Sequence, residues 1–179
     1  MVPRSRAGHA LVSQVSGQYS KARSDRSLRC MHILVPIDYS ELAQKALRTA
    51  CSLHPDATIT VLHVIDFRSS DPGPGGWGET PGTWDDWLAE ARQHADELLE
   101  NATAIAAEYD IEIATDTAVG EDASTIVEYT ENNDIDLVII GSHGRSLPAR
   151  FLLGDVSETV VRRAPVPVLV VRGQQQLDG

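Results

Sequence analysis

The sequence predicts an α/β protein: a five-stranded parallel sheet with helices on both faces, in a Rossmann-like arrangement. Short apolar runs rich in β-branched residues alternate with longer segments of helical period between residues 31 and 172. Consecutive strands of this kind pair in parallel only through crossover helices, and such crossovers place helices on both faces of the sheet. With 179 residues, 42% of them hydrophobic, the chain can bury one core of ordinary size.

Five strands and four helices are expected in strict alternation. Runs of Val, Ile and Leu predict buried strands at residues 32–37, 58–65 and 136–141, the first of them buried on both faces, and a last strand at 167–171. Alternating polar and apolar residues at 111–117 predict a strand that is open on one face or lies at an edge. Helical periods predict helices at residues 41–53, from 86 to about 109, at 121–132 and at 155–163. Ser40 is the expected N-cap of the first helix.

Residues 1–30 differ in composition from the remainder of the chain. They hold six of the 15 basic residues and one of the 26 acidic residues, and they show no sustained apolar period. We expect a basic extension without fixed structure, or the product of a start codon assigned too early, with a nucleic-acid-binding arm as the alternative. The expected domain then covers residues 31–172, and residues 173–179 form a tail.

The domain itself is strongly acidic. Nine basic and 25 acidic residues remain in residues 31–179, a net charge of −16, and Lys45 is the one lysine among them. This charge argues against binding of nucleic acid through a basic face. A lysine-poor acidic surface suits concentrated salt, so we expect a halophilic cytoplasm, with an acidic mesophile as the alternative. No run approaches the ~20 apolar residues of a membrane span, so no membrane partner is expected.

Three segments can meet where a parallel sheet binds its ligands, beyond the carboxyl ends of the strands at the point where strand order reverses. They are residues 36–40, residues 63–66 and the loop that follows Ile140. That loop contains Gly141 and Gly144, then nine residues, then Gly154 at the start of a helix. Glycines allow close approach of a phosphate, and a helix N-terminus offers free N–H groups. The loop therefore predicts a phosphate-binding site.

Residues 31–172 resemble the universal stress protein family. The resemblance rests on the Pro-x-Asp-x-Ser pattern at 36–40, on LHVID at 62–66, on DLVIIGSHGRS at 136–146 and on LLGDVSETVVRRAPVPVLVVR at 152–172. Nucleotide-binding members carry Gly-x2-Gly-x9-Gly-(Ser/Thr), and Gly141, Gly144 and Gly154 fit this spacing without insertion. The resemblance implies an adenine nucleotide alpha hydrolase-like fold that binds ATP, with or without Mg²⁺, or another adenine nucleotide.

The resemblance also implies which residues line the nucleotide site. Asp38 lies at the adenine end, Val64 contributes backbone groups to adenine, and the glycine loop holds the phosphates. Ser40 is expected as a helix cap more than as a ligand contact. The full implied set is Pro36, Ile37, Asp38, Ser40, Val64, Ile140, Gly141, Gly144, Arg145, Gly154, Asp155 and Val156.

Asp155 departs from the family pattern, because it stands where a Ser or Thr hydroxyl contacts phosphate. A carboxylate about 4 Å from a phosphate repels it by roughly 4 kcal/mol at an effective dielectric near 20. Three arrangements relieve this: Asp155 turns outward as an N-cap, Mg²⁺ bridges the two anions, or salt screens them. Arg145 and Arg150 offer compensating charge, and Ser157 is a candidate replacement for the missing hydroxyl.

Catalytic motifs are absent from the sequence. It has no Gly-x-Ser-x-Gly elbow, no Walker loop and no metal-ligand spacing among its six histidines. We therefore expect a stress-linked sensor or switch and no enzyme or metal site, although slow ATP hydrolysis stays open. The alternative is a dimeric stress protein that binds no nucleotide and acts through protein partners.

The last strand predicts a homodimer. Residues 167–171 are almost wholly apolar, and no later strand follows to cover their edge. An exposed apolar edge promotes aggregation, and pairing with a second copy about a two-fold axis satisfies it. Dimerisation through the final strand is also what the family resemblance implies.

Overall fold

The computed structural model describes residues 30–66, 84–142 and 153–173. The expected extension at 1–30, apart from Cys30, and most of the expected tail at 173–179 lie outside these residues. Strands and helices alternate along the chain as the sequence predicts. The elements are β1 (His32–Pro36), α2 (Glu41–Leu53), β2 (Thr58–Ile65), α3 (Trp84–Ala107), β3 (Ala114–Val119), α4 (Asp122–Asn132), β4 (Leu137–Gly141), α5 (Asp155–Arg163) and β5 (Val168–Val171).

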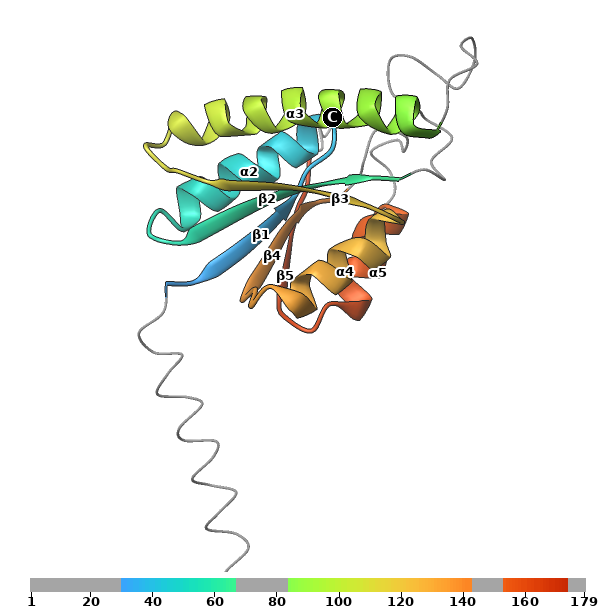
Figure 1. Cartoon of the computed structure of the whole chain (residues 1–179). Helices are drawn as coiled ribbons and strands as arrows, with labels where there is room; N and C mark the ends of the chain where they lie inside the picture. The colour runs from blue at the N-terminus through green and yellow to red at the C-terminus, as the bar shows by residue number, and fades with distance from the viewer. Residues whose placement is uncertain (1–29, 67–83, 143–152, 174–179) are drawn as a thin grey trace, which may run out of the picture. The chain divides into compact units, whose positions relative to one another are not determined.

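The five strands form one parallel sheet in the order β3-β2-β1-β4-β5. This confirms the predicted fold class. β1 pairs with β2 on one side and with β4 on the other, so the strand order reverses at β1 (Figure 1). The carboxyl ends of β1 and β4 therefore form the topological switch point, the place where sheets of this kind bind ligands.

Two helices cover each face of the sheet. α2 and α3 lie over one face, and α4 and α5 lie over the other (Figure 1). Alternate residues of β1 supply the two cores, because Ile33 and Val35 pack under α2 and α3 while Leu34 packs under α4 and α5. This two-sided burial explains why the strand reads as a continuous apolar run.

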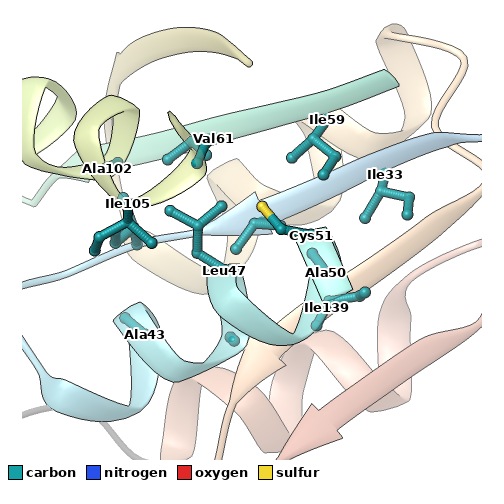
Figure 2. Packing of buried hydrophobic residues seen from close by; sticks show 14 of the residues in the cluster. Ile33, Ala43, Leu47, Ala50, Cys51, Ile59, Val61, Ala102, Ile105 and Ile139 are labelled. Carbon is teal, nitrogen blue, oxygen red and sulfur yellow. The ribbon is translucent and has the colours of Figure 1, made fainter. Parts of the chain in front are cut away.

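Small residues bring α2 close to the sheet. Its buried face carries Ala43, Ala46 and Ala50, and Figure 2 shows Leu47 and Cys51 facing the residues of the strands. The Ser40 hydroxyl accepts a hydrogen bond of 3.2 Å from the amide of Ala43, which confirms the predicted cap.

Several element boundaries differ from the prediction. β1 ends at Pro36, α3 begins at Trp84, α4 begins at Asp122 and β5 begins at Val168. The largest difference is β3, which spans Ala114–Val119 and not residues 111–117, although its position at an edge of the sheet is as predicted. Among the described residues, no helix is both long enough and apolar enough to cross a membrane.

Candidate functional site

Asp38 lies in the turn between β1 and α2, at the switch point of the sheet. Its Oδ1 atom accepts hydrogen bonds from the backbone amide of Ser40, at 3.0 Å, and from the Ser40 hydroxyl. Its Oδ2 atom accepts no hydrogen bond from the residues that the structure describes, and the side chain is only half-buried. One carboxylate oxygen is thus fixed by the turn, and the other can accept from a ligand donor.

The backbone of Val64 faces the same part of the edge. The carbonyl of Leu62 accepts from the amide of Ile37 at 2.8 Å, so the backbone groups of Leu62 point toward β1. Backbone groups of alternate strand residues point the same way, and those of Val64 therefore point past the end of β1. The Val64 side chain is 9% exposed and packs in the core, which leaves its backbone as the part that can bind a ligand.

The two ends of the β4–α5 loop are joined by buried hydrogen bonds. The amide of Gly154 donates to the carbonyl of Ser142 at 2.7 Å, and the Ser157 hydroxyl lies 2.9 Å from the same carbonyl. The Gly154 amide also lies 3.1 Å from the Ser157 hydroxyl oxygen. Ser157 is 3% exposed, so its hydroxyl closes the base of the loop and does not replace the missing Ser or Thr hydroxyl at position 155.

The N-terminus of α5 offers three backbone donors. Gly154 is the N-cap, which corrects the expectation that Asp155 could cap the helix, and Asp155 is the first helical residue. The first helical hydrogen bond runs from the amide of Glu158 to the carbonyl of Gly154. The amides of Asp155, Val156 and Ser157 therefore have no partner within the helix and can bind an anion. The Asp155 side chain is exposed.

Carboxylates gather along this edge of the sheet. Burial, together with the charges of Asp66, Asp38 and Glu121, raises the pKa of Asp122 to about 6. Asp38, Asp66 and Asp122 follow β1, β2 and β3, so each lies at a carboxyl end. The edge is electronegative beside Asp38, and an anionic ligand group is better placed at α5.

His63 of β2 contacts the turn that carries Asp38. Its Nδ1 atom lies 2.9 Å from the carbonyl oxygen of Ile37, and its ring makes an edge contact with the ring of Tyr39. Burial lowers the pKa of His63, against the opposing effects of the Ile37 hydrogen bond and of the Asp38 charge. The ring is therefore neutral at pH 7.

Ten of the twelve residues predicted for the site lie at or next to the switch point, while Gly144 and Arg145 lie outside the described residues, as does Arg150. Among the ten, the side chains of Pro36, Ile37, Val64 and Ile140 are buried, so only their backbones can bind. The described residues hold no group of three or more His, Cys, Asp or Glu side chains that could bind a metal.

The contact of His63 with the Asp38 turn and the raised pKa of Asp122 were not predicted from the sequence. The signal for Asp122 was its position directly after the turn at Gly120, which follows an edge strand. The signal for His63 was a polar ring within a strand that is otherwise buried, because such a ring needs a hydrogen-bond partner.

These features define a class of protein: an α/β domain with a candidate ligand site at the switch point of a parallel sheet. The sequence model of the Universal stress protein family matches residues 30–172, and the chain belongs to this family. A universal stress protein of Methanocaldococcus jannaschii is 31% identical over 142 residues, which cover 78% of this chain and 81% of the relative. Another, from Bacillus subtilis, is 32% identical over 144 residues, which cover 78% and 97%.

Solved structures agree with this family and with the fold. A universal stress protein of Lactobacillus plantarum has a TM-score of 0.65 and 28% identity, with 80% of this chain and 99% of that chain covered. One of Archaeoglobus fulgidus, solved in complex with dAMP, has a TM-score of 0.55 and 26% identity, with 79% and 98% covered.

Proposed function

We propose that this protein binds an adenine nucleotide at the carboxyl edge of β1 and β4 and acts as a stress-linked sensor or switch in the cytoplasm. The observation that carries the proposal is the convergence at the switch point of three features. They are an Asp38 oxygen that accepts no hydrogen bond from the described residues, the backbone of Val64, which points past the end of β1, and the first amides of α5, which have no partner within the helix. The dAMP complex of the Archaeoglobus fulgidus relative supports the same class of ligand.

The chemistry of the edge orients the nucleotide. Adenine carries an amino donor and ring acceptors, which suit the Asp38 carboxylate and the polar backbone groups of Val64. Phosphate suits the amides of Asp155, Val156 and Ser157, because a helix N-terminus favours an anion. The acidity near Asp38 disfavours the reverse orientation.

Asp155 weakens phosphate binding less than a buried carboxylate would. Its side chain is exposed, so water surrounds it and the effective dielectric approaches that of the solvent. Two charges about 4 Å apart then repel by about 1 kcal/mol, which is roughly a fivefold effect on affinity. ATP with Mg²⁺ is therefore compatible with this site, and we propose ATP as a ligand alongside dAMP.

The alternative function is a stress protein that binds no nucleotide and acts through protein partners. The electronegative edge around Asp122 and the exposed carboxylate of Asp155 favour it, because both repel phosphate. Binding to a macromolecular partner would need no anion at this edge.

We further propose that two copies pair through β5, that the protein operates in concentrated salt, and that it is not an enzyme. β5 has β4 on one side only, and Leu169 in it is 37% exposed. The net charge of −16 over residues 31–179 supports function in salt and opposes binding of nucleic acid.

Calorimetric titration of the full chain in molar KCl tests the proposed function. We expect dAMP, ATP and adenosine to bind, and Asp38→Asn to weaken all three, since all three share adenine. Asp155→Ser should tighten ATP binding by at most about fivefold and leave adenosine unchanged, because adenosine carries no phosphate. Absence of binding of dAMP and of ATP at millimolar concentration, with and without Mg²⁺, would support the alternative.

A further inference from the structure

We propose that His63 is a positioning residue, which holds the turn at Asp38 so that the free Asp38 oxygen faces the nucleotide. The inference deepens the proposed function and rests on it for the ligand. It assigns a role to a side chain on β2 whose hydrogen bond goes to the backbone of Ile37, next to Asp38.

His63 contacts both chain neighbours of Asp38. Its Nδ1 atom lies 2.9 Å from the carbonyl oxygen of Ile37, the residue before Asp38. Its ring lies 5.8 Å from the ring of Tyr39, the residue after Asp38, with the two planes at 75° in an edge contact. One side chain on the sheet therefore restrains the turn on both sides of the carboxylate.

The hydrogen bond to Ile37 settles the form of the imidazole. A carbonyl oxygen accepts and never donates, so Nδ1 must carry the hydrogen, and Nε2 then carries a lone pair in the neutral ring. Burial lowers the pKa of His63, which keeps the ring neutral at pH 7. A neutral ring restrains the turn without forming an ion pair with Asp38, so the second carboxylate oxygen is left to accept from a ligand.

The turn lies at the surface of the domain. Tyr39 is 39% exposed, and Asp38 and Ser40 are half-buried. The amide of Ile37 is paired with the carbonyl of Leu62, and Ser40 makes capping contacts within the turn itself. His63 adds a side-chain tie between this turn and the neighbouring strand.

Two substitutions separate positioning from simple stability. His63→Leu puts an apolar side chain of similar size in place of the imidazole and removes the donor to Ile37. His63→Asn keeps a donor near the place of Nδ1, because the Asn amide nitrogen occupies a similar position. We expect the affinity for dAMP to fall about tenfold in His63→Leu and to recover largely in His63→Asn. Equal losses in the two variants would overturn the proposal.

His32→Leu is the matched control. His32 lies at the opposite end of β1, and its Nε2 atom is 2.8 Å from the Thr60 hydroxyl. Its loss should lower the thermal unfolding midpoint while leaving dAMP affinity within about twofold. An equal affinity loss in His32→Leu would mean that general destabilisation explains the effect of His63→Leu, and the proposal would fail.

A double-mutant cycle tests whether His63 acts through Asp38. In the Asp38→Asn background, His63→Leu should weaken dAMP binding by less than about twofold, because the carboxylate that it positions is gone. The same tenfold loss in both backgrounds would show that His63 acts on the ligand by another route.

NMR spectra of the nucleotide-free protein test the positioning role of His63 independently of nucleotide binding. The His63 ring nitrogens should show the neutral form with hydrogen on Nδ1. His63→Leu should shift the Ser40 amide and the Asp38 carboxyl signals, and His63→Asn should shift them less. Unchanged signals in His63→Leu would overturn the positioning role whether or not dAMP binds, whereas failure of the parent protein to bind dAMP would overturn the proposed function.

Discussion

Gly141 shows how one glycine in the phosphate-binding motif serves the packing of the protein. A Cβ atom at this position would lie 3.0 Å from the carbonyl carbon of Leu42 and 3.1 Å from its Cβ atom. The first turn of α2 therefore rests directly on the end of β4. The sequence suggested close approach of a phosphate as the reason for this glycine, but contact between two backbones already requires it.

We expect Gly141→Ala to destabilise the fold by about 1–3 kcal/mol, because the backbone at Leu42 must move to admit a methyl group. Chemical unfolding in molar KCl measures this. Gly173→Ala is the matched control, since its Cβ would lie 3.6 Å from the Leu42 Cδ2 atom, an ordinary contact. Similar losses in the two variants would contradict the packing explanation.

Ser157 marks a limit of residue-level prediction. It stands two positions after Asp155 on a helix, and the sequence makes it a candidate replacement for the missing hydroxyl. Its hydroxyl instead lies 2.9 Å from the carbonyls of Ser142 and Gly154. Ser142 and Ser157 are 15 residues apart in the chain, and such a contact depends on how the loop closes, which no local pattern reveals.

Elements were predicted well where a strand is buried on both faces and poorly where it is exposed. β1, β2 and β4 lie in the interior of the sheet, and their apolar runs predicted them to within one residue at each end. β3 lies at an edge, and its residues are small, polar and largely exposed. Ile111 and Ile113 gave the strand-like alternation, yet they lie before β3 and pack against the core under α2 and α3.

The start of α4 gives the protein a pH-dependent stability. Burial and the charges of Asp66, Asp38 and Glu121 raise the pKa of Asp122 from 3.8 to about 6. The native state therefore binds this proton more tightly than the unfolded state does. The contribution of Asp122 to the free energy of unfolding falls as pH rises from about 4 to 6, and the penalty is complete above that range.

Asp122→Asn should remove this penalty. We expect the variant to be more stable than the parent by about 1 kcal/mol at pH 7.5, a value reduced for the half-exposed position and for the lost attraction to the helix N-terminus. The difference should vanish near pH 4, where Asp122 is protonated in both states. Chemical unfolding at the two pH values measures it.

Glu128→Gln, at an exposed position of the same helix, is the control and should show no such pH-dependent gain. A parent protein that equals Asp122→Asn in stability at pH 7.5 would contradict the role assigned to Asp122. That result would show that the carboxylates at the edge do not repel one another appreciably.

β5 is the edge strand of the sheet that we expect to pair with a second copy of the protein. Leu169 is 37% exposed, whereas Val168 and Val170 are partly buried against the core under α4 and α5. Lys45 donates a hydrogen bond of 2.8 Å to the carbonyl of Arg172, which fixes the end of this strand to α2. A rigid apolar edge of this kind favours pairing between copies.

If two copies pair through β5 as proposed, Leu169→Lys should leave a monomer in molar KCl without unfolding it, because the Leu169 side chain is exposed in the single chain. Light scattering gives the mass, and circular dichroism reports the fold. Val170→Lys is less informative, since a charge there would also disrupt the core. A parent protein that is monomeric at micromolar concentration would contradict pairing through β5.

The sequence predicted which segments meet at the switch point, but not the charge that gathers there. The switch point follows from the order of alternating elements, and the residues at its strand ends follow from the boundaries of three apolar runs. The acidity of the edge could not be read in the same way, because Asp38, Asp66 and Asp122 are far apart in the chain. Only the order of strands in the sheet brings their charges together.

Titration of the full chain with dAMP in molar KCl, followed through the backbone amide signals by NMR, tests for a nucleotide site at the switch point. We expect saturable shifts at residues 37–40, at Val64 and at residues 155–157. We expect little change at the amino edge of the sheet, at His32, Thr58 and Asp136. Signals that stay unchanged at millimolar dAMP, or shifts confined to another surface, would contradict a nucleotide site at the switch point.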